Sequence, residues 1–136
     1  MSEIVALSDA VSLALHGMGL LAAGGRRNAR EMAEEMNVSE AHLAKVFQRL
    51  GKNGLVISTR GPGGGFELAM DAGKISLFQI YSVIEGVPSE KYCLLRKNEC
   101  PFEECIFGSV LEKVTLDFVD YLKQTTLADL KRGVKA

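Results

Sequence analysis

The order of predicted elements between residues 28 and 69 constrains the fold more than any other feature of this sequence. Asn28, with Glu31 three residues later, resembles a capping box and predicts a short helix with an inward apolar face at positions 32, 33 and 36. After a tight turn at 37–38, Ser39 caps a second helix with apolar positions 43, 46, 47 and 50, which Asn53-Gly54 ends. Two short helices joined by such a turn are typical of a helix-turn-helix.

A two-stranded hairpin is predicted directly after these two helices. The β-branched run L-V-I-S-T (55–59) and the run F-E-L-A (66–69) flank the turn R-G-P-G-G-G. A helix-turn-helix followed at once by a hairpin has the element order of a winged helix. The expected fold is therefore mainly α with a small β-hairpin.

Further helices are expected on both sides of this unit. Residues 8–23 predict an apolar, largely buried helix, and a helix opening at Ser76 is stopped by Gly86. Residues 106–122 predict a long helix with more apolar positions than one core-facing stripe needs, which indicates burial against its own domain and against a second chain. A short turn capped by Thr126, over 127–131, follows. We interpret 1–86 as a winged helix-turn-helix domain, 87–105 as a cysteine loop, and 106–136 as a dimerisation helix with its tail.

Charge is segregated although the net charge is only −1. Residues 41–66 contain no Asp or Glu, yet they include Lys45, Arg49, Lys52 and Arg60. These cations lie on the second helix and at the hairpin tip, the two elements with which a winged helix contacts DNA. A solvated helix face is the alternative, but such a face normally mixes both signs of charge.

The glycine-rich turn of the hairpin has two interpretations. Gly61, Gly63 and Gly64 allow positive φ angles and let backbone N–H groups approach a phosphate, with Arg60 placed to enter a narrow minor groove. The alternative is a hairpin tip that needs glycine only to turn. The turn is not a Walker loop, because no Lys-Ser or Lys-Thr follows the glycines.

Three cysteines lie close together in a loop-like segment, at Cys93, Cys100 and Cys105. An odd number of thiols fits a disulfide framework poorly. Clustered thiolates in a flexible segment suit an iron–sulfur cluster or zinc, and Arg96 and Lys97 would help keep them deprotonated. Three free thiols, or thiol oxidation without any metal, remain the alternatives.

The run S-E-A-H-L-A-K-V-F-Q-R-L-G-K-N-G-L-V-I-S-T-R-G-P-G-G-G-F-E-L-A closely resembles the helix-plus-wing signature of the Rrf-type family of regulators, which includes BadM-, IscR- and NsrR-like proteins. The resemblance extends over nearly the whole chain. It implies a homodimeric, sequence-specific winged-helix transcriptional regulator that binds a double-stranded DNA operator. The implied DNA contacts are Ser39, His42, Lys45, Arg49, Arg60, Gly61, Gly63 and Gly64.

The resemblance also implies an iron–sulfur cluster on Cys93, Cys100 and Cys105, with 2Fe–2S expected in preference to 4Fe–4S, and hence sensing of iron–sulfur status, nitric oxide or redox state. In this chain six residues and then four separate the cysteines, whereas IscR-like members space them evenly, and Gly108 stands where those members carry a histidine. The implied fourth ligand is Asp9 of the partner subunit. His16 comes second, although a hydrogen-bonded core histidine is the better interpretation of it, and Glu103 or Glu104 third.

Other classes of protein are disfavoured. We expect no enzyme, because no nucleophile–base pair or paired carboxylates with suitable spacing stand out. No apolar run reaches the roughly 18 residues of a membrane span, and the N-terminus lacks a secretory signal pattern. The expected location is the cytoplasm, where thiols stay reduced.

Overall fold

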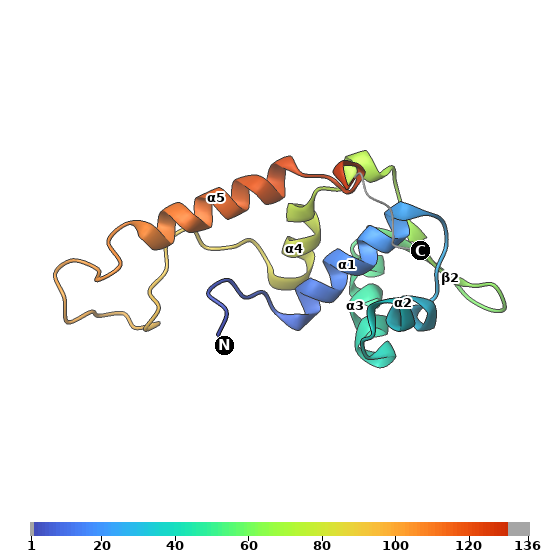
Figure 1. Cartoon of the computed structure of the whole chain (residues 1–136), viewed down its shortest axis with the longest axis horizontal. Coiled ribbons are helices and arrows are strands. Elements are labelled where there is room, and N and C mark those ends of the chain that lie inside the picture. The colour runs from blue at the N-terminus through green and yellow to red at the C-terminus, as the bar shows by residue number, and fades with distance from the viewer. Residues whose placement is uncertain (1, 131–136) are drawn as a thin grey trace.

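The structure is a computed structural model that describes residues 2–130 (Figure 1). Its elements in chain order are α1 (Asp9–Ala23), α2 (Ala29–Met36), α3 (Glu40–Lys52), β1 (Val56–Thr59), β2 (Gly65–Leu68), the 3-10 helix η1 (Ala72–Lys74), α4 (Leu77–Glu85), α5 (Val110–Gln124) and the 3-10 helix η2 (Leu127–Asp129). The elements up to α4 gather at one end of the molecule, and α5 with the loop before it extends away from them (Figure 1). The predicted winged helix-turn-helix with a long C-terminal helix is confirmed.

Polar side chains start each of the first four α-helices. Every one of these caps accepts a hydrogen bond from the backbone N–H three residues later, which satisfies a donor that has no partner inside the helix. The pairs are Ser8 with Val11, Asn28 with Glu31, Ser39 with His42 and Ser76 with Gln79, at 3.2, 2.8, 3.2 and 3.1 Å. The helix starts predicted at Asn28, Ser39 and Ser76 are therefore confirmed.

The core lies where α1, α3 and α4 pack together. The four predicted inward positions of α3 are all buried, with at most 3% of any side chain exposed, at Leu43, Val46, Phe47 and Leu50. Gly17 of α1 faces Phe47 so closely that a Cβ there would lie 2.5 Å from the ring carbon Cε2. This contact sets the separation between α1 and α3.

The hairpin is fastened to the rest of the domain along β2. Val56 stands opposite Leu68 and Thr59 opposite Gly65 in the antiparallel register. The backbone of Arg27, just before α2, exchanges two hydrogen bonds with Phe66, of 3.0 and 2.8 Å. The Phe66 ring in turn packs against Phe47, with ring centroids 5.3 Å apart, so the wing and α3 share one core.

Residues 87–124 form an excursion that leaves and rejoins the domain at the two ends of α4. The chain departs at Gly86, whose φ of 81° ends α4. It returns at the other end of this helix, where Leu77 donates its N–H to the Thr125 carbonyl (2.9 Å) and Leu127 donates to Ile75 (3.0 Å). Leu127 is 1% exposed and belongs to the main core.

The long C-terminal helix begins at Val110 and not at the predicted Ile106. The cause is local: Gly108 adopts a left-handed φ of 58°, and its N–H bonds the Cys105 carbonyl at 2.8 Å in a turn that does not continue as a helix. After α5, the Asp129 carboxylate accepts the Thr126 N–H at 2.8 Å, which confirms the predicted capped turn, although Lys131 lies outside the described residues.

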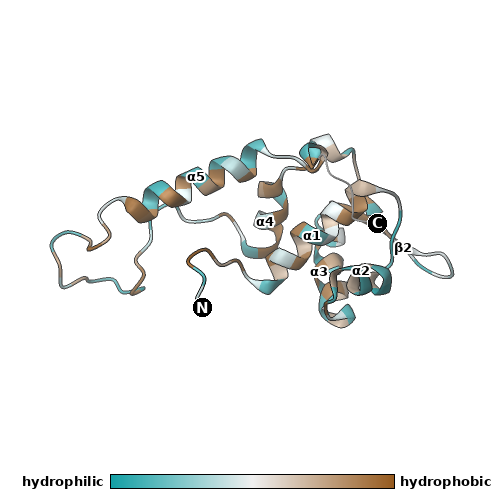
Figure 2. Ribbon diagram, viewed as in Figure 1, coloured by the Kyte–Doolittle hydropathy of each residue, from teal (hydrophilic) through white to brown (hydrophobic). Residues whose placement is uncertain are grey.

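Much of the apolar surface of α5 is uncovered. Apolar residues recur along its whole length (Figure 2). Val119 and Leu122 are buried against the domain, but Val110, Val114 and Tyr121 are 56, 52 and 59% exposed. One of the two predicted contact faces of this helix is therefore occupied within the chain, and the other is free in the described structure.

Candidate nucleic-acid interface and cysteine segment

The outward face of α3 is a line of four exposed side chains, Ala41, Lys45, Gln48 and Lys52. Their spacing places them on one stripe of the helix, opposite the buried positions. Lys45 and Lys52 are thus confirmed as surface groups of this helix. Gln48 shares this stripe by its helical spacing, although it is not among the predicted DNA contacts.

Ser39 and His42 occupy the N-terminal end of α3. The Ser39 hydroxyl accepts the His42 N–H at 3.2 Å, so this side chain serves the helix as its cap. The His42 side chain is exposed. Both residues lie at the end of the helix that enters the groove in helix-turn-helix proteins, and their predicted DNA contacts stay predictions.

Arg49 is directed toward α4 and not along the outward stripe. Its guanidinium donates hydrogen bonds to the carbonyl oxygens of Ile84 (2.9 Å) and Val83 (3.2 Å). These carbonyls belong to the last turn of α4, where oxygens lack partners within the helix and the helix dipole favours a cation. Arg49 therefore ties α3 to the end of α4, and a DNA contact by this residue would require these bonds to break.

The three glycines of the wing tip differ in whether their surroundings leave room for a Cβ atom. Gly61 and Gly63 have φ angles of 89° and 73° and nothing near the position of a Cβ, so they leave the tip open to a partner. At Gly64, by contrast, a Cβ would lie 2.3 Å from the Thr59 carbonyl oxygen, so the hairpin itself requires glycine. The side chain of Arg60 is exposed beside them.

Arg26, which is not among the predicted site residues, contacts the wing from the segment before α2. Its guanidinium donates to the Gly63 carbonyl at 3.3 Å and forms an ion pair with Glu67 at 3.5 Å. Among the ion pairs of residues 2–130, none includes Lys45, Lys52 or Arg60. The charges of these three side chains are therefore not paired with a neighbouring carboxylate in the described structure.

The three cysteines are free and exposed on the loop that precedes α5. Cys93 and Cys105 open the same kind of turn: each carbonyl accepts the N–H of the third residue on, Arg96 at 2.9 Å and Gly108 at 2.8 Å. Those two residues share left-handed φ angles of 56° and 58°. Successive backbone N–H groups in such turns form concave sites for anions, including the sulfur atoms of iron–sulfur centres.

Both turns direct N–H groups at sulfur. The N–H groups of Leu95 and then Lys97 hold the pKa of the Cys93 thiol below its ordinary value. The Phe107 N–H lies 3.4 Å from the Cys105 sulfur. Three accessible thiols, two of them stabilised as acceptors, fit a soft metal ion or an iron–sulfur cluster. Within residues 2–130, however, no three Cys, His, Asp or Glu side chains are gathered as a ligand set, so binding requires the loop to rearrange.

Two of the predicted fourth ligands, Asp9 and His16, lie in α1, and the other two, Glu103 and Glu104, lie on the cysteine loop. Asp9 is exposed in the first turn of α1, while the cysteine loop extends beyond the outer end of α5 (Figure 1). His16 is exposed and not a core residue, which corrects that expectation, although its Nδ1 does lie 2.7 Å from the Ser12 carbonyl oxygen. Glu103 and Glu104 are exposed on the loop.

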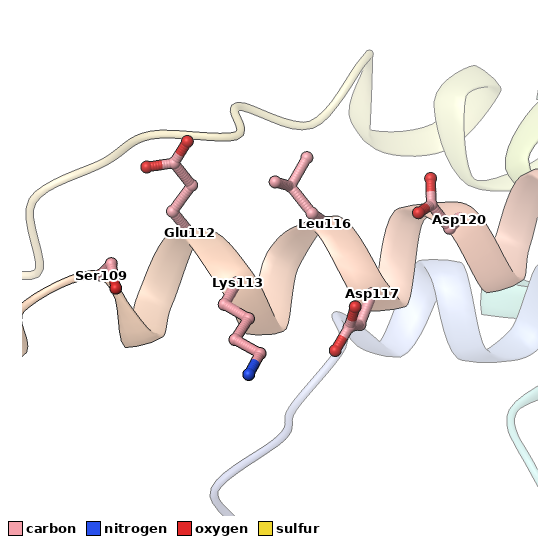
Figure 3. Close-up of a pocket in the computed structure, with 6 residues that line it drawn as sticks. All are labelled: Ser109, Glu112, Lys113, Leu116, Asp117 and Asp120. Atoms are coloured by element: carbon pink, nitrogen blue, oxygen red, sulfur yellow. The ribbon is translucent and has the colours of Figure 1, made fainter.

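A shallow hollow on α5 does not have the character of an enzyme site. All six lining residues come from this one helix, and Glu112, Leu116 and Asp120 point to one side while Lys113 and Asp117 point to the other (Figure 3). The residues therefore do not converge on a shared reacting position.

Across residues 2–130, no helix has both the length and the apolar character needed to cross a bilayer.

Comparisons with known proteins agree with this geometry. A family model described as Rrf2, iron-dependent transcriptional regulator, matches residues 7–133. A Haemophilus influenzae protein described as an HTH-type transcriptional regulator is 34% identical over 120 residues, which are 87% of this chain and 80% of that protein. The HTH-type transcriptional regulator IscR of Cronobacter sakazakii is 30% identical over 74% of this chain and 62% of its own length.

The fold has close counterparts among solved structures. The structure of CymR, the global cysteine regulator of Bacillus subtilis, matches with a TM-score of 0.72 and 28% identity, covering 93% of this chain and 96% of that one. These relatives are transcriptional regulators and not enzymes. With its helix-turn-helix, cationic α3 and glycine-rich wing, the chain belongs to the Rrf2 family of DNA-binding transcriptional regulators.

Proposed function

We propose that the protein acts as a homodimer that binds a specific double-stranded operator, with α3 in the major groove and the wing tip against the backbone or minor groove. The observation that carries this proposal is the uncompensated charge of Lys45 and Lys52 on α3 together with Arg60 at the wing. Two copies related by two-fold symmetry would present two such faces to successive major grooves.

The free face of α5 supports the dimer. Val110, Val114 and Tyr121 expose apolar surface on a helix that is already packed on its other side. Ile4 and Val5, before α1, are 99 and 58% exposed as well. Exposed apolar side chains of this size are typical of a contact between subunits.

We further propose that Cys93, Cys100 and Cys105, with Asp9 of the partner subunit, hold an iron–sulfur cluster. When bound, such a cluster supplies a group that oxygen, nitric oxide or peroxide can destroy. The protein's own part is to draw the cysteine loop into one conformation, because the sulfur atoms in the described structure are not gathered. The family description as iron-dependent and the similarity to IscR support this proposal.

A conformational change in the cysteine loop would be transmitted to the DNA-contacting helix α3 through α4. The loop follows directly on the last turn of α4, and Arg49 of α3 holds that same turn by two carbonyl oxygens. A displacement of this turn would therefore move α3, and with it the spacing of the two DNA-contacting helices in the dimer. We place this activity in the cytoplasm, where free thiols stay reduced.

Anaerobic isolation followed by analysis of iron, sulfide and zinc tests the cofactor. Iron with sulfide and visible absorbance supports the cluster, whereas colourless protein with stoichiometric zinc contradicts it. Cys100→Ser should abolish the colour and change affinity for the operator, while Asn98→Ser on the same exposed loop should change neither. If colour is lost and operator affinity stays the same, the sensing proposal is wrong but DNA binding is not.

A metal-free thiol switch is the second candidate. The lowered pKa of Cys93, caused by backbone N–H groups, increases its thiolate fraction and hence its reactivity toward oxidants. Mass spectrometry of peroxide-treated, metal-free protein distinguishes this candidate. It predicts oxidation at Cys93 together with a change in operator affinity in protein that contains neither iron nor zinc.

A further inference from the structure

The outward stripe of α3 contains one side chain that is suited to reading a base. Its four members, Ala41, Lys45, Gln48 and Lys52, recur with the spacing of one helix face, so all of them meet whatever α3 contacts. The lysines are flexible point charges that pair well with phosphates, and they carry little sequence information when they do so. Ala41 offers only a methyl group. Gln48 alone presents an acceptor and two donors in a fixed plane.

Other polar groups of α3 are already engaged or lie elsewhere. The Ser39 hydroxyl caps the helix, and the Arg49 guanidinium is bound to the end of α4. His42 lies toward the flank of the helix, off the outward line. Among the hydrogen bonds of residues 2–130, none uses the Gln48 side chain, so its amide is available to a partner without breaking a bond inside the protein.

In the proposed docking of α3, the flanking charges would bring this amide to the floor of the major groove. Lys45 lies one turn before Gln48 and Lys52 one turn after it on the same face. When these two cations contact the phosphates that border a major groove, the side chain between them points at the base edges. The nitrogen of a planar amide donates to N7 of an adenine while its oxygen accepts from the N6 amino group of the same base, which distinguishes A·T from the other base pairs.

We propose that Gln48 determines sequence specificity by pairing with an adenine in the major groove, once in each half of the operator. The inference rests on the proposed placement of α3 in DNA and adds the identity of one base pair that it reads. A correct adenine pairing of this kind should favour A·T over other pairs at that position by roughly 5- to 150-fold.

Selection from a randomised duplex library with the full-length protein tests the proposal. The wild-type chain should enrich a motif with an A·T pair at one symmetric position. Gln48→Ala should lose the preference at that position only, and Gln48→Glu should replace adenine by cytosine there, because a carboxylate accepts from the cytosine amino group. Lys45→Ala is the matched control, which should weaken binding to all sequences and leave the motif unchanged.

A chemical probe completes the test. Replacing the nominated adenine with 7-deazaadenine removes the N7 acceptor, and it should weaken binding by the wild-type chain while leaving Gln48→Ala unaffected. An unchanged motif in both Gln48 variants overturns the inference while DNA binding stands. Failure of the wild-type chain to enrich any motif overturns the proposed function and this inference with it.

Discussion

Replacing Gly17 with alanine will place a methyl group at the closest approach between α1 and α3. The new Cβ would lie 2.5 Å from Cε2 and 2.6 Å from Cζ of Phe47, distances that real Cβ contacts do not reach. Phe47 has no room to withdraw, because it is fully buried and its ring packs against Phe66 at 5.3 Å. The two helices must therefore move apart.

Two effects of opposite sign decide the size of the change in stability. Alanine is favoured over glycine in a helix interior by about 1 kcal/mol. Forcing an extra carbon into a close-packed core costs about 1–3 kcal/mol, and the overlap with two ring carbons places this case near the upper limit. We expect a net loss of about 1–2 kcal/mol from the free energy of unfolding.

Gly19→Ala in the same helix is the matched control. Its Cβ would lie 3.5 Å from Leu130 Cδ1, which is an ordinary contact, so only the helix-propensity gain of about 1 kcal/mol applies. The two variants should differ by about 2–3 kcal/mol. With a urea dependence of about 2 kcal/mol per molar, their unfolding midpoints should differ by about 1–1.5 M.

Urea unfolding followed by far-ultraviolet circular dichroism at one fixed protein concentration makes the comparison, because a dimer's stability depends on concentration. A Gly17→Ala midpoint at or above that of Gly19→Ala would refute the described packing of α1 on α3. A changed urea dependence would also count against it, because the added methyl group is expected to change the native core alone.

Five further substitutions at four residues test other contacts. Lys45→Ala should lower the slope of log affinity against log salt by about one unit, and an unchanged slope would remove this lysine from the phosphate contacts. Arg49→Ala should reduce stability by about 1–2 kcal/mol in thermal unfolding, and Arg49→Lys should recover only part, because a flexible lysine side chain does not hold its ammonium where the planar guanidinium places its nitrogen. Gly64→Ala, whose Cβ would meet the Thr59 carbonyl at 2.3 Å, should distort the wing and weaken operator binding in fluorescence anisotropy; full affinity would contradict the wing contact. Leu127→Ala should cost about 2–5 kcal/mol in urea unfolding, and a loss below about 1 kcal/mol would exclude the C-terminal turn from the core.

Local signals predicted most of the winged helix. The Ser39 cap and the apolar spacing of α3 act within a few residues, so the start and inward face of this helix could be derived from the sequence. The hairpin followed for the same reason from β-branched residues around a glycine turn. The position of Gln48 on the outward stripe can also be derived from the sequence, because it depends on the helical period alone.

Contacts between distant residues could not be derived in this way. Nothing near Arg49 in the chain indicates that its guanidinium binds carbonyls 34 and 35 residues later. The burial of Leu127 in the main core depends likewise on how α5 returns to the domain. The late start of α5 does have a local signal, because a glycine at position 108 permits the left-handed φ that ends the preceding turn.

Residues 87–124 are attached to the domain at the two ends of the nine-residue helix α4. This segment could therefore vary in sequence and length without disturbing the rest of the fold. Its interior can lengthen, shorten or exchange its chemistry while the two attachment points stay fixed, because neither the cysteine loop nor the outer part of α5 supplies the main core. The same winged-helix domain can therefore accommodate different segments at this position. Any displacement of residues 87–124 relative to the domain would act on α4, whose last turn is bound by the Arg49 guanidinium.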